Sequence, residues 1–266
     1  MKQHLARFMP KLLKVIGKKI ILITLHSLNH LMRTVTAATH RLQFYTEYHV
    51  FNTPESFDHF IDLYYLWRKQ RYPIWLERGI FGLLTCKDQG DVLELCCGDG
   101  FNARNFYPIR AKSIVAVDFE RDVIRFAQKY NSAPNIRFLT ADIRYAMPQG
   151  VFDTIIWDAA IEHFTETEIY QLLNEIKPRL KDGGYLSGYT IVEKTDGSKS
   201  HSLHEYEFKS KEDLLRFFSP HFKNVKVFET VYPIRHNLYF WASDDTLPFD
   251  EEWHNQIRSR SAHTIA

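Results

Sequence analysis

The sequence predicts an α/β fold in which a mostly parallel β-sheet carries helices on both faces. Short apolar runs alternate with segments of helical periodicity from residue 92 to residue 218, an order that is typical of parallel sheets. The first run, Val92–Leu95, stops abruptly before Gly98 and Gly100. Open α/β sheets bind nucleotide-like ligands where a buried strand breaks into such a turn ahead of a helix.

The predicted elements follow one another with short connections. Apolar runs bounded by turn residues predict strands, and apolar residues three or four positions apart predict helices. In chain order these elements are strands at Val92–Leu95 and Ile114–Val117, helix Arg121–Tyr130, strands at Ile136–Leu139 and Phe152–Trp157, helix Glu166–Ile176, strand Tyr185–Ile191 and helix Lys211–Phe218. Two further apolar runs, Val225–Phe228 and Leu238–Trp241, close the series.

The length and composition fit one catalytic domain with an extension. The chain has 266 residues, 45% hydrophobic and 25% charged, which is enough for one large core of ordinary globular composition. Its three cysteines, Cys86, Cys96 and Cys97, surround one predicted strand, and neighbouring cysteines are a poor framework for a secreted disulfide fold. We therefore expect reduced, buried thiols and a cytoplasmic location.

Residues 1–46 form a basic arm. They contain eight Lys and Arg and no Asp or Glu, which leaves 26 basic and 32 acidic residues for the rest of the chain. The cations recur at helical spacing between Arg7 and Lys18, and apolar residues from Leu5 to Ile23 recur about half a turn away. This pattern predicts an amphipathic helix. Its longest uninterrupted apolar run is too short to span a bilayer. Peripheral docking on an anionic membrane, packing against the domain or an oligomer partner, and polyanion binding all remain open, while a signal peptide is disfavoured.

A second apolar run ends in Asp118, twenty residues after Gly98. A carboxylate at this place can accept hydrogen bonds from both hydroxyls of a ribose. The turn lacks the third glycine of the dinucleotide-binding fingerprint and the lysine of a phosphate-binding P-loop. The expected ligand is therefore a nucleoside without phosphates, and an NAD-dependent oxidoreductase is disfavoured.

Five spaced segments resemble class I S-adenosylmethionine (SAM) dependent methyltransferases. Glu94–Gly100 is similar to their acid-x-Gly-x-Gly-x-Gly motif, with Cys96 in place of the first glycine. Asp118 matches their ribose-binding acid, and Ala141–Ile143 matches the segment that touches the adenine. The other two segments, Phe152–Asp158 and Leu180–Leu186, resemble the fourth strand and the lead into the fifth.

This resemblance implies a Rossmann-like, seven-stranded sheet that ends in an antiparallel hairpin, with SAM as cofactor and S-adenosylhomocysteine (SAH) as product. The arm is then residues 1–46, the methyltransferase domain residues 47–247 with cap helices at 47–85, and residues 248–266 a polar tail. The residues implied to contact the cofactor are Glu94, Cys96, Gly98, Gly100, Asp118, Phe119, Asp142, Ile143 and Asp158.

Helices ahead of the first strand commonly cap the cofactor in this family. Residues 54–84 have helical spacing, and Pro73 stands at the start of a second helix. The candidates for contact with the methyl acceptor are Tyr64, Tyr65, Arg68 and Trp75 in this region and Tyr206 after the fifth strand. Core packing of these aromatic residues is the alternative, and an exposed strand is the alternative for residues around Tyr206.

The segment Asp158–His163 resembles the Glu-His segment of ubiquinone-biosynthesis O-methyltransferases and of small-RNA 3′-terminal 2′-O-methyltransferases. In members of those groups a Glu-x-x-Glu-His with a later histidine holds a divalent metal ion, but Ala159 occupies the first Glu position here. The later histidine is His201 or His204.

Three roles are open for this segment. His163 can act as a general base polarised by Glu162, since imidazole titrates near neutral pH. Alternatively, Glu162, His163 and His204 can bind a divalent metal ion, although a protein without a metal is the main prediction. In the third interpretation the Glu-His pair positions loops and the methionine part of the cofactor.

The sequence therefore predicts a SAM-dependent methyltransferase that acts on a small-molecule, sugar-linked or lipid-linked acceptor, with oxygen as the favoured methyl acceptor. The alternatives are an RNA methyltransferase that uses the basic arm and a catalytically silent SAM-binding scaffold. We expect a cytoplasmic protein that can sit peripherally at the inner membrane face, and the oligomeric state is left open.

Overall fold

The computed structural model of the chain describes residues 2–46, 50, 74–194, 196–232 and 235–246. The chain divides into two compact units, residues 1–70 and residues 71–266, and each is described by itself. The first unit contains the long helix α1 (Lys2–Tyr45). The helix predicted for the basic arm is therefore present, and it continues well beyond the periodic segment that predicted it.

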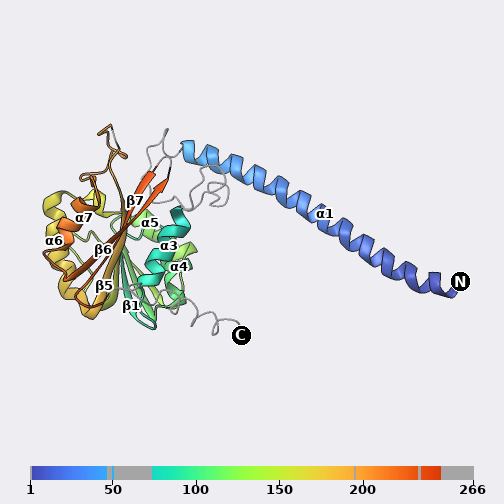
Figure 1. The fold of residues 1–266 in the computed structure, drawn as a ribbon, viewed down its shortest axis with the longest axis horizontal. Coiled ribbons are helices and arrows are strands. Elements are labelled where there is room, and N and C mark those ends of the chain that lie inside the picture. The colour runs from blue at the N-terminus through green and yellow to red at the C-terminus, as the bar shows by residue number, and fades with distance from the viewer. Residues whose placement is uncertain (1, 47–49, 51–73, 195, 233–234, 247–266) are drawn as a thin grey trace. The chain divides into compact units, whose positions relative to one another are not determined.

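The second unit contains strands and helices in alternation (Figure 1). The strands are β1 (Asp91–Leu95), β2 (Ser113–Asp118), β3 (Ile136–Thr140), β4 (Phe152–Asp158), β5 (Leu180–Ile191), β6 (Asn224–Tyr232) and β7 (Arg235–Ser243). The α-helices are α3 (Ile74–Thr85), α4 (Phe101–Asn105), α5 (Arg121–Tyr130), α6 (Glu166–Ile176) and α7 (Lys211–Phe218). Short 3₁₀ turns follow α4, β4 and α6: η3 (Tyr107–Ile109), η4 (Ile161–His163) and η5 (Lys177–Arg179).

The strands form one seven-stranded sheet in the order β3-β2-β1-β4-β5-β7-β6. Strands β1 to β5 are parallel to one another, and β7 is antiparallel to both β5 and β6. The chain runs outward from β1 to β3 and then returns to the other side of β1 with β4. Ligands of open α/β sheets bind at such a switch point, and the predicted fold class is confirmed.

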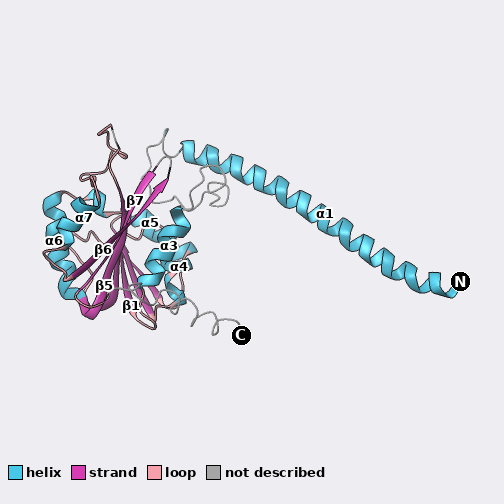
Figure 2. Cartoon of the chain, viewed as in Figure 1, coloured by secondary structure: helices cyan, strands magenta, loops and turns pink. Residues whose placement is uncertain are grey.

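Helices cover both faces of the sheet (Figure 2), with α3, α4 and α5 on one face and α6 and α7 on the other. Successive residues of a strand point to opposite faces, so β1 contributes to two cores. Leu93 and Leu95 pack in the core that contains α6 and α7, whereas Val92 packs in the core that contains α4 and α5. The sheet is therefore buried on both faces, which explains the continuous apolar runs in its parallel strands.

Local capping sets several helix boundaries. The Thr165 hydroxyl accepts from the Glu168 backbone N–H, and the Glu168 carboxylate accepts from the Thr165 backbone N–H. This reciprocal capping box starts α6, and the Ser210 hydroxyl starts α7 by accepting from the Asp213 backbone. Helices α5, α6 and α7 have the bounds that the sequence predicted.

Strand β5 is longer than expected, since it begins at Leu180 and not at Tyr185. Phe152 of β4 pairs with Leu180, but Thr154 pairs with Tyr185, so the register shifts between these two pairs. The extra residues on β5 form an irregularity of the β-bulge type. The segment expected to lead into the fifth strand is the first part of the strand itself.

Candidate active site at the carboxyl end of the sheet

The turn after β1 holds a left-handed backbone. The φ angle is 54° at Cys96, 53° at Gly98 and 74° at Gly100, in the region that glycine adopts most easily. A Cβ atom on Gly100 would lie 2.5 Å from the Phe138 ring, so this position leaves no room for a side chain. Cys96 stands where the family motif has its first glycine, and its positive φ gives the physical reason for that glycine.

Asp118 connects the turn to the neighbouring strand ends. One carboxylate oxygen accepts from the Gly98 N–H at 3.0 Å and the other from the Glu120 N–H at 2.9 Å. The Asp118 carbonyl accepts from the Ala141 N–H at 2.9 Å. Burial raises the pKa of Asp118, although these backbone N–H groups act in the opposite direction. The carboxylate predicted to bind a ribose therefore lies beside the glycine turn.

A set of hydrogen bonds to Asp158 links α3, α4 and β4. Asp158 Oδ2 accepts from Arg78 Nη2 at 2.6 Å and from Asn102 Nδ2 at 3.2 Å. Glu94 is 2% exposed, and burial, together with the charges of Asp158 and Asp99, raises the pKa of Glu94 well above its ordinary value. In the described part of the chain, Glu94 Oε2 and Asn102 Oδ1 are buried without a hydrogen-bond partner. Buried acceptors of this kind favour a ligand that donates hydrogen bonds.

The remaining predicted cofactor residues lie at the ends of β2 and β3. Phe119 is 64% exposed, whereas Ile143 is buried in the core. The Asp142 carboxylate accepts from Arg144 Nη2 at 2.7 Å, and this hydrogen bond lowers the pKa of Asp142. Burial raises the pKa of Cys96, and the nearby charges of Asp118 and Asp142 raise it further. The structure therefore places Asp142 close to the glycine turn.

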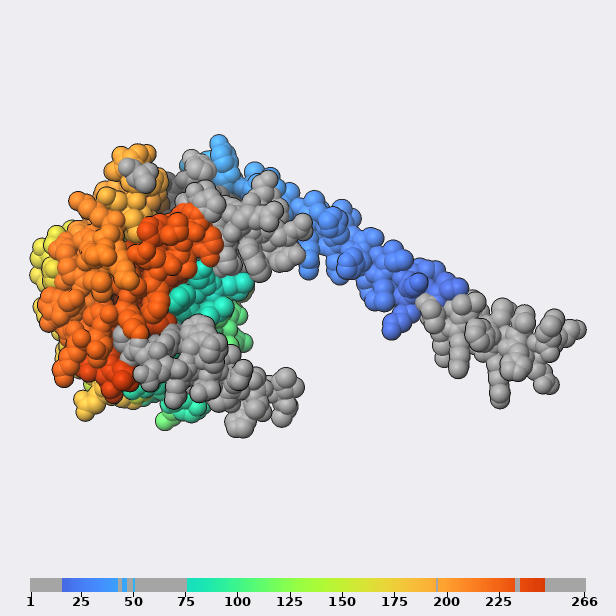
Figure 3. Space-filling model, viewed as in Figure 1, coloured from blue at the N-terminus to red at the C-terminus, as the bar shows by residue number. Residues whose placement is uncertain are grey.

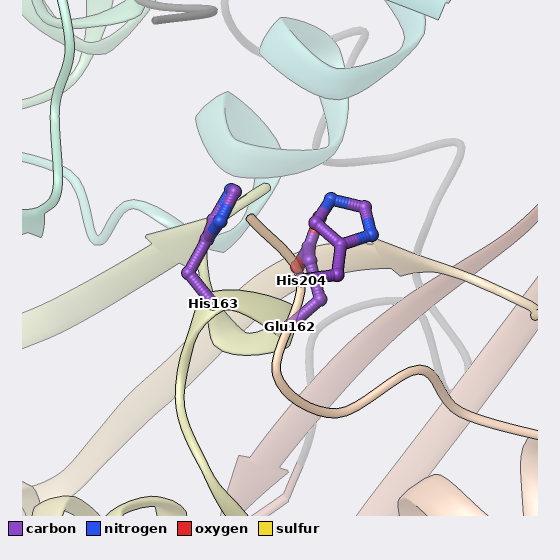
Figure 4. Close-up of side chains that lie close together, drawn as sticks. All are labelled: Glu162, His163 and His204. Atoms are coloured by element: carbon purple, nitrogen blue, oxygen red, sulfur yellow. The ribbon is translucent and has the colours of Figure 1, made fainter. Parts of the chain in front are cut away.

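Glu162, His163 and His204 lie together at the same edge of the sheet (Figure 4). The first two belong to η4, directly after β4, and His204 comes from the loop between β5 and α7. One ligand atom of each residue lies within 4.8 Å of the others, and the two imidazole centroids are 4.9 Å apart. Ligands bound to one metal ion at about 2.1 Å are roughly 3 to 4 Å apart. The spacing of the three side chains is thus close to that of metal ligands.

Hydrogen bonds determine which nitrogen of each ring carries hydrogen. His204 Nδ1 lies 2.6 Å from Glu207 Oε1, and His163 Nδ1 lies 3.2 Å from the Leu203 carbonyl oxygen. A carboxylate and a carbonyl can only accept, so each Nδ1 is the donor. Each neutral ring therefore keeps its lone pair on Nε2, the nitrogen available to a metal ion or a proton.

Two carboxylates at this site, Glu162 and Glu207, accept hydrogen bonds from neighbouring side chains. Glu162 is 3% exposed, and its Oε2 accepts from the Thr190 hydroxyl at 3.0 Å. Burial acts to raise the pKa of Glu207, but the hydrogen bonds from Ser200 and His204 together lower it below its ordinary value. An ionised Glu207 orients His204 in the way that a carboxylate orients a metal-binding histidine.

Tyr206 lies close by in sequence, but its hydroxyl is engaged elsewhere. It donates to Asp213 Oδ1 at 2.9 Å, and its ring packs against Phe208 and Phe217. His204 and Phe208 are buried, so residues 201–208 are not an exposed strand. Tyr64, Tyr65 and Arg68 lie outside the described residues, and Trp75 lies in α3 with its side chain outside them.

Three residues that hydrogen-bond to candidate site residues were not predicted from the sequence. Arg78 is eighty positions from its partner Asp158, and Thr190 is 28 positions from Glu162, so neither pair has a local signal. Glu207 follows His204 by three positions. A search for carboxylates near each histidine would have found it.

Comparison with known proteins gives the family of this domain. Residues 92–184 match the family model described as a methyltransferase domain. Uncharacterized methyltransferases of Mycobacterium bovis and Mycobacterium tuberculosis are 36% identical over 103 residues, which cover 38% of this chain and 50% of each relative. The chain therefore spans about half the length of the curated relatives it matches.

Solved structures share the fold at low sequence identity. The N-methyltransferase NodS from Bradyrhizobium japonicum in complex with SAH is 17% identical with a TM-score of 0.52, and the match covers 67% of this chain and 92% of that one. The DhpI–SAH complex is 15% identical with a TM-score of 0.53, and the match covers 79% and 98% of the two chains. The family match over residues 92–184, the relatives and the shared fold all support a class I SAM-dependent methyltransferase domain.

Proposed function

We propose that the protein transfers the methyl group of SAM to a hydroxyl oxygen of a small, sugar-linked or lipid-linked acceptor. The observation that supports an oxygen acceptor is the convergence of Glu162, His163 and His204, whose ligand atoms lie within 4.8 Å of one another. This donor set suits a divalent ion, and an ion bound there would hold the oxygen atoms of an acceptor.

The described residues fit SAM as the cofactor. Asp118, beside Gly98, can accept from the ribose hydroxyls. The buried acceptors of Glu94 and Asn102 suit the ammonium group of the methionine part, and the nearby guanidinium of Arg78 suits its carboxylate. When bound, SAM supplies a methyl group that its sulfonium makes electrophilic. The protein then has to hold the acceptor in line and to accommodate its proton.

The cluster favours metal binding over a lone general base. A general base needs only one imidazole with a free nitrogen. Here both His163 and His204 carry hydrogen on Nδ1 and leave Nε2 free. His204 is also 3% exposed and held by Glu207, an arrangement that a separate base at His163 does not require. A bound divalent ion supplies Lewis acidity, which lowers the pKa of a coordinated hydroxyl.

Binding of a divalent ion here does not require the first glutamate of the Glu-x-x-Glu-His segment. Ala159 stands at that position, and the adjacent Asp158 is already bound to Arg78 and Asn102. The chain therefore offers three ligands from Glu162, His163 and His204. Three protein ligands leave coordination positions open for water or an acceptor, as in catalytic metal sites.

Metal binding can be tested on the full chain without knowledge of the acceptor. Titration calorimetry with Mn²⁺, Mg²⁺ and Zn²⁺ should show one strong site, and His204→Ala should weaken its affinity at least about 100-fold. The control is His30→Ala, because His30 is exposed on α1. The metal assignment is wrong if no ion binds or if His204→Ala and His30→Ala behave alike.

Methyl transfer needs a separate test. The protein is incubated with methyl-labelled SAM and with catechols, sugars or a lipid extract, with and without a chelator. We expect label in ether linkages, and less of it with the chelator. Label found on nitrogen or carbon would overturn the oxygen assignment but not the methyltransferase, whereas no SAH binding by calorimetry would overturn both.

A further inference from the structure

We infer that α1 is an interfacial anchor that binds the surface of an anionic phospholipid bilayer. Its described side chains expose large apolar residues in a nearly continuous series. The exposed fractions are 45% to 64% for Ile16, Ile20, Ile21, Leu22, Ile23, Leu25, Leu28, Leu31, Met32 and Val35 (blue in Figure 3). Soluble surfaces rarely present so many adjacent apolar side chains to water, and patches of this kind mark interaction sites.

The polar residues of the same stretch gather on one side of the helix. An α-helix turns by about 100° per residue. At that angle the strongly polar residues between positions 16 and 35 fall within roughly one third of the circumference; they are Lys18, Lys19, His26, Asn29, His30 and Arg33. Leu22 is the one large apolar residue in that sector, and the rest of the circumference holds apolar, small or hydroxyl-bearing residues. A wide apolar face opposite a narrow cationic face is the pattern of a helix that lies in a membrane interface.

The charge of the arm specifies the kind of membrane. Residues 1–46 contain eight Lys and Arg and no acidic residue, so the arm is complementary to a surface of negative lipid headgroups. In an interfacial orientation, Lys18, Lys19 and Arg33 extend to the headgroups while the apolar face enters the acyl boundary. Among the helices that the structure describes, none is long and apolar enough to cross a bilayer. The helix therefore lies on the surface.

Self-association fits these observations less well. Ile21, Leu25, Leu28, Met32 and Val35 follow a heptad spacing, which a coiled coil could use as its seam. A seam of this width would leave Ile16, Ile20 and Ile23 exposed, and two parallel copies would bring like charges together without any acidic residue to pair with them. A bilayer covers the whole apolar face and neutralises the cations.

A nucleic-acid partner accounts for the cations but not for the apolar face. Proteins that bind single-stranded nucleic acids stack the bases on aromatic side chains. The apolar residues of α1 from Ile16 to Val35 are all aliphatic. The apolar area would then stay in contact with water in an RNA complex.

The test measures binding of the full chain to vesicles. Vesicles of phosphatidylglycerol mixed with phosphatidylcholine are compared with vesicles of phosphatidylcholine alone, by cosedimentation at low and high salt. The cation variant combines Lys18→Gln, Lys19→Gln and Arg33→Gln, and the apolar variant combines Leu25→Gln, Leu28→Gln and Leu31→Gln. Glutamine preserves helix propensity. The matched control removes three exposed cations from the methyltransferase domain: Lys112→Gln, Lys209→Gln and Lys223→Gln.

We expect the wild-type protein and the control to bind the anionic vesicles, more weakly at high salt, and to bind the neutral vesicles poorly. The cation variant should lose roughly 100-fold in affinity for anionic vesicles, and the apolar variant should lose at least as much. The affinity for SAH, measured by calorimetry on the same preparations, should be unchanged. Loss of vesicle binding with SAH affinity intact then distinguishes loss of the α1 anchor from damage to the methyltransferase domain or to cofactor binding.

Three results would overturn the inference that α1 is a membrane anchor. One is the absence of wild-type binding to anionic vesicles, and another is retained binding by either α1 variant. The third is that the chain forms an α1-dependent dimer without lipid, or binds RNA despite the apolar substitutions, more tightly than it binds anionic vesicles.

Discussion

The glycine turn after β1 and the cluster of Glu162, His163 and His204 lie at the same edge of the sheet but are built in different ways. The turn depends on backbone angles at neighbouring positions, and Asp118 holds it through backbone N–H groups. The cluster takes side chains from η4 and from a loop about forty residues later. Thr190, Glu207 and the Leu203 carbonyl hold them by hydrogen bonds. Changes in the turn should therefore affect cofactor binding, and changes around the cluster should affect metal binding alone.

The largest expected effect is at Gly100. Gly100→Ala combines a left-handed φ of 74° with a Cβ that would lie 2.5 Å from the Phe138 ring. We expect a loss of about 3 kcal/mol or more in the free energy of unfolding and SAH affinity below detection. Denaturant unfolding and SAH calorimetry measure the two effects.

Gly197→Ala is the matched control for Gly100→Ala. Gly197 has a φ of 72° and no atom within 4 Å of a Cβ placed on it, so the substitution costs only the backbone strain of about 1 kcal/mol. Similar losses in the two variants would show that contact with Phe138 does not constrain the turn.

The next largest effect should be on metal binding and should come from Glu207. Glu207→Gln replaces the carboxylate that accepts from His204 Nδ1 at 2.6 Å, so this hydrogen bond loses the negative charge that strengthens it. We expect metal affinity to fall about 10- to 100-fold with SAH affinity unchanged. Glu205→Gln, at an exposed position two residues earlier, should leave both affinities intact. A parallel loss of SAH affinity would mean that the two regions are not independent.

A smaller effect, with a defined pH dependence, is expected at Glu94. The pKa of Glu94 is raised in the folded protein from an ordinary value of 4.5, so the folded state holds a proton more tightly than the unfolded chain. Its contribution to stability is present below about pH 4.5 and is lost as the pH rises toward the folded pKa. Glu94→Gln removes this loss, so the ligand-free variant should gain stability relative to wild type as the pH rises above about 4.5.

The same Glu94→Gln variant should bind SAH about tenfold more weakly, because the ammonium group of bound SAH would favour the ionised form of Glu94, a charge that glutamine cannot supply. Thermal unfolding over a pH series and calorimetry at neutral pH measure the two effects, with Glu205→Gln as control. Parallel pH profiles for Glu94→Gln and wild type would contradict the raised pKa of this buried carboxyl.

The smallest effect is expected at Cys96. Cys96→Gly relieves a positive φ of 54°, a gain of about 1 kcal/mol that the added freedom of the unfolded chain largely offsets. We expect the free energy of unfolding to change by less than about 0.5 kcal/mol and SAH affinity to stay within about threefold. A large loss of SAH affinity would show that the Cys96 side chain itself contacts the cofactor.

Much of the fold could be predicted because its signals are local. The helices Arg121–Tyr130 and Glu166–Ile176 have the predicted bounds, since their caps lie within a few residues of their ends. The early start of β5 at Leu180 was not predicted, because it depends on a register shift against β4. The side chains around the acids were not predicted either, since Arg78 reaches Asp158 from a helix ahead of the first strand.

The sequence by itself determined the order of strands and helices, the glycine turn with its acid at Asp118, and the basic, acid-free arm, because all of these depend on residue type and short-range spacing. Only the tertiary structure decided that Glu162, His163 and His204 converge, that each ring leaves Nε2 free, and that the apolar face of α1 is exposed. The physical reason is that a side chain's partner, its tautomer and its exposure are set by the segments that fold against it, and those segments are distant in the chain.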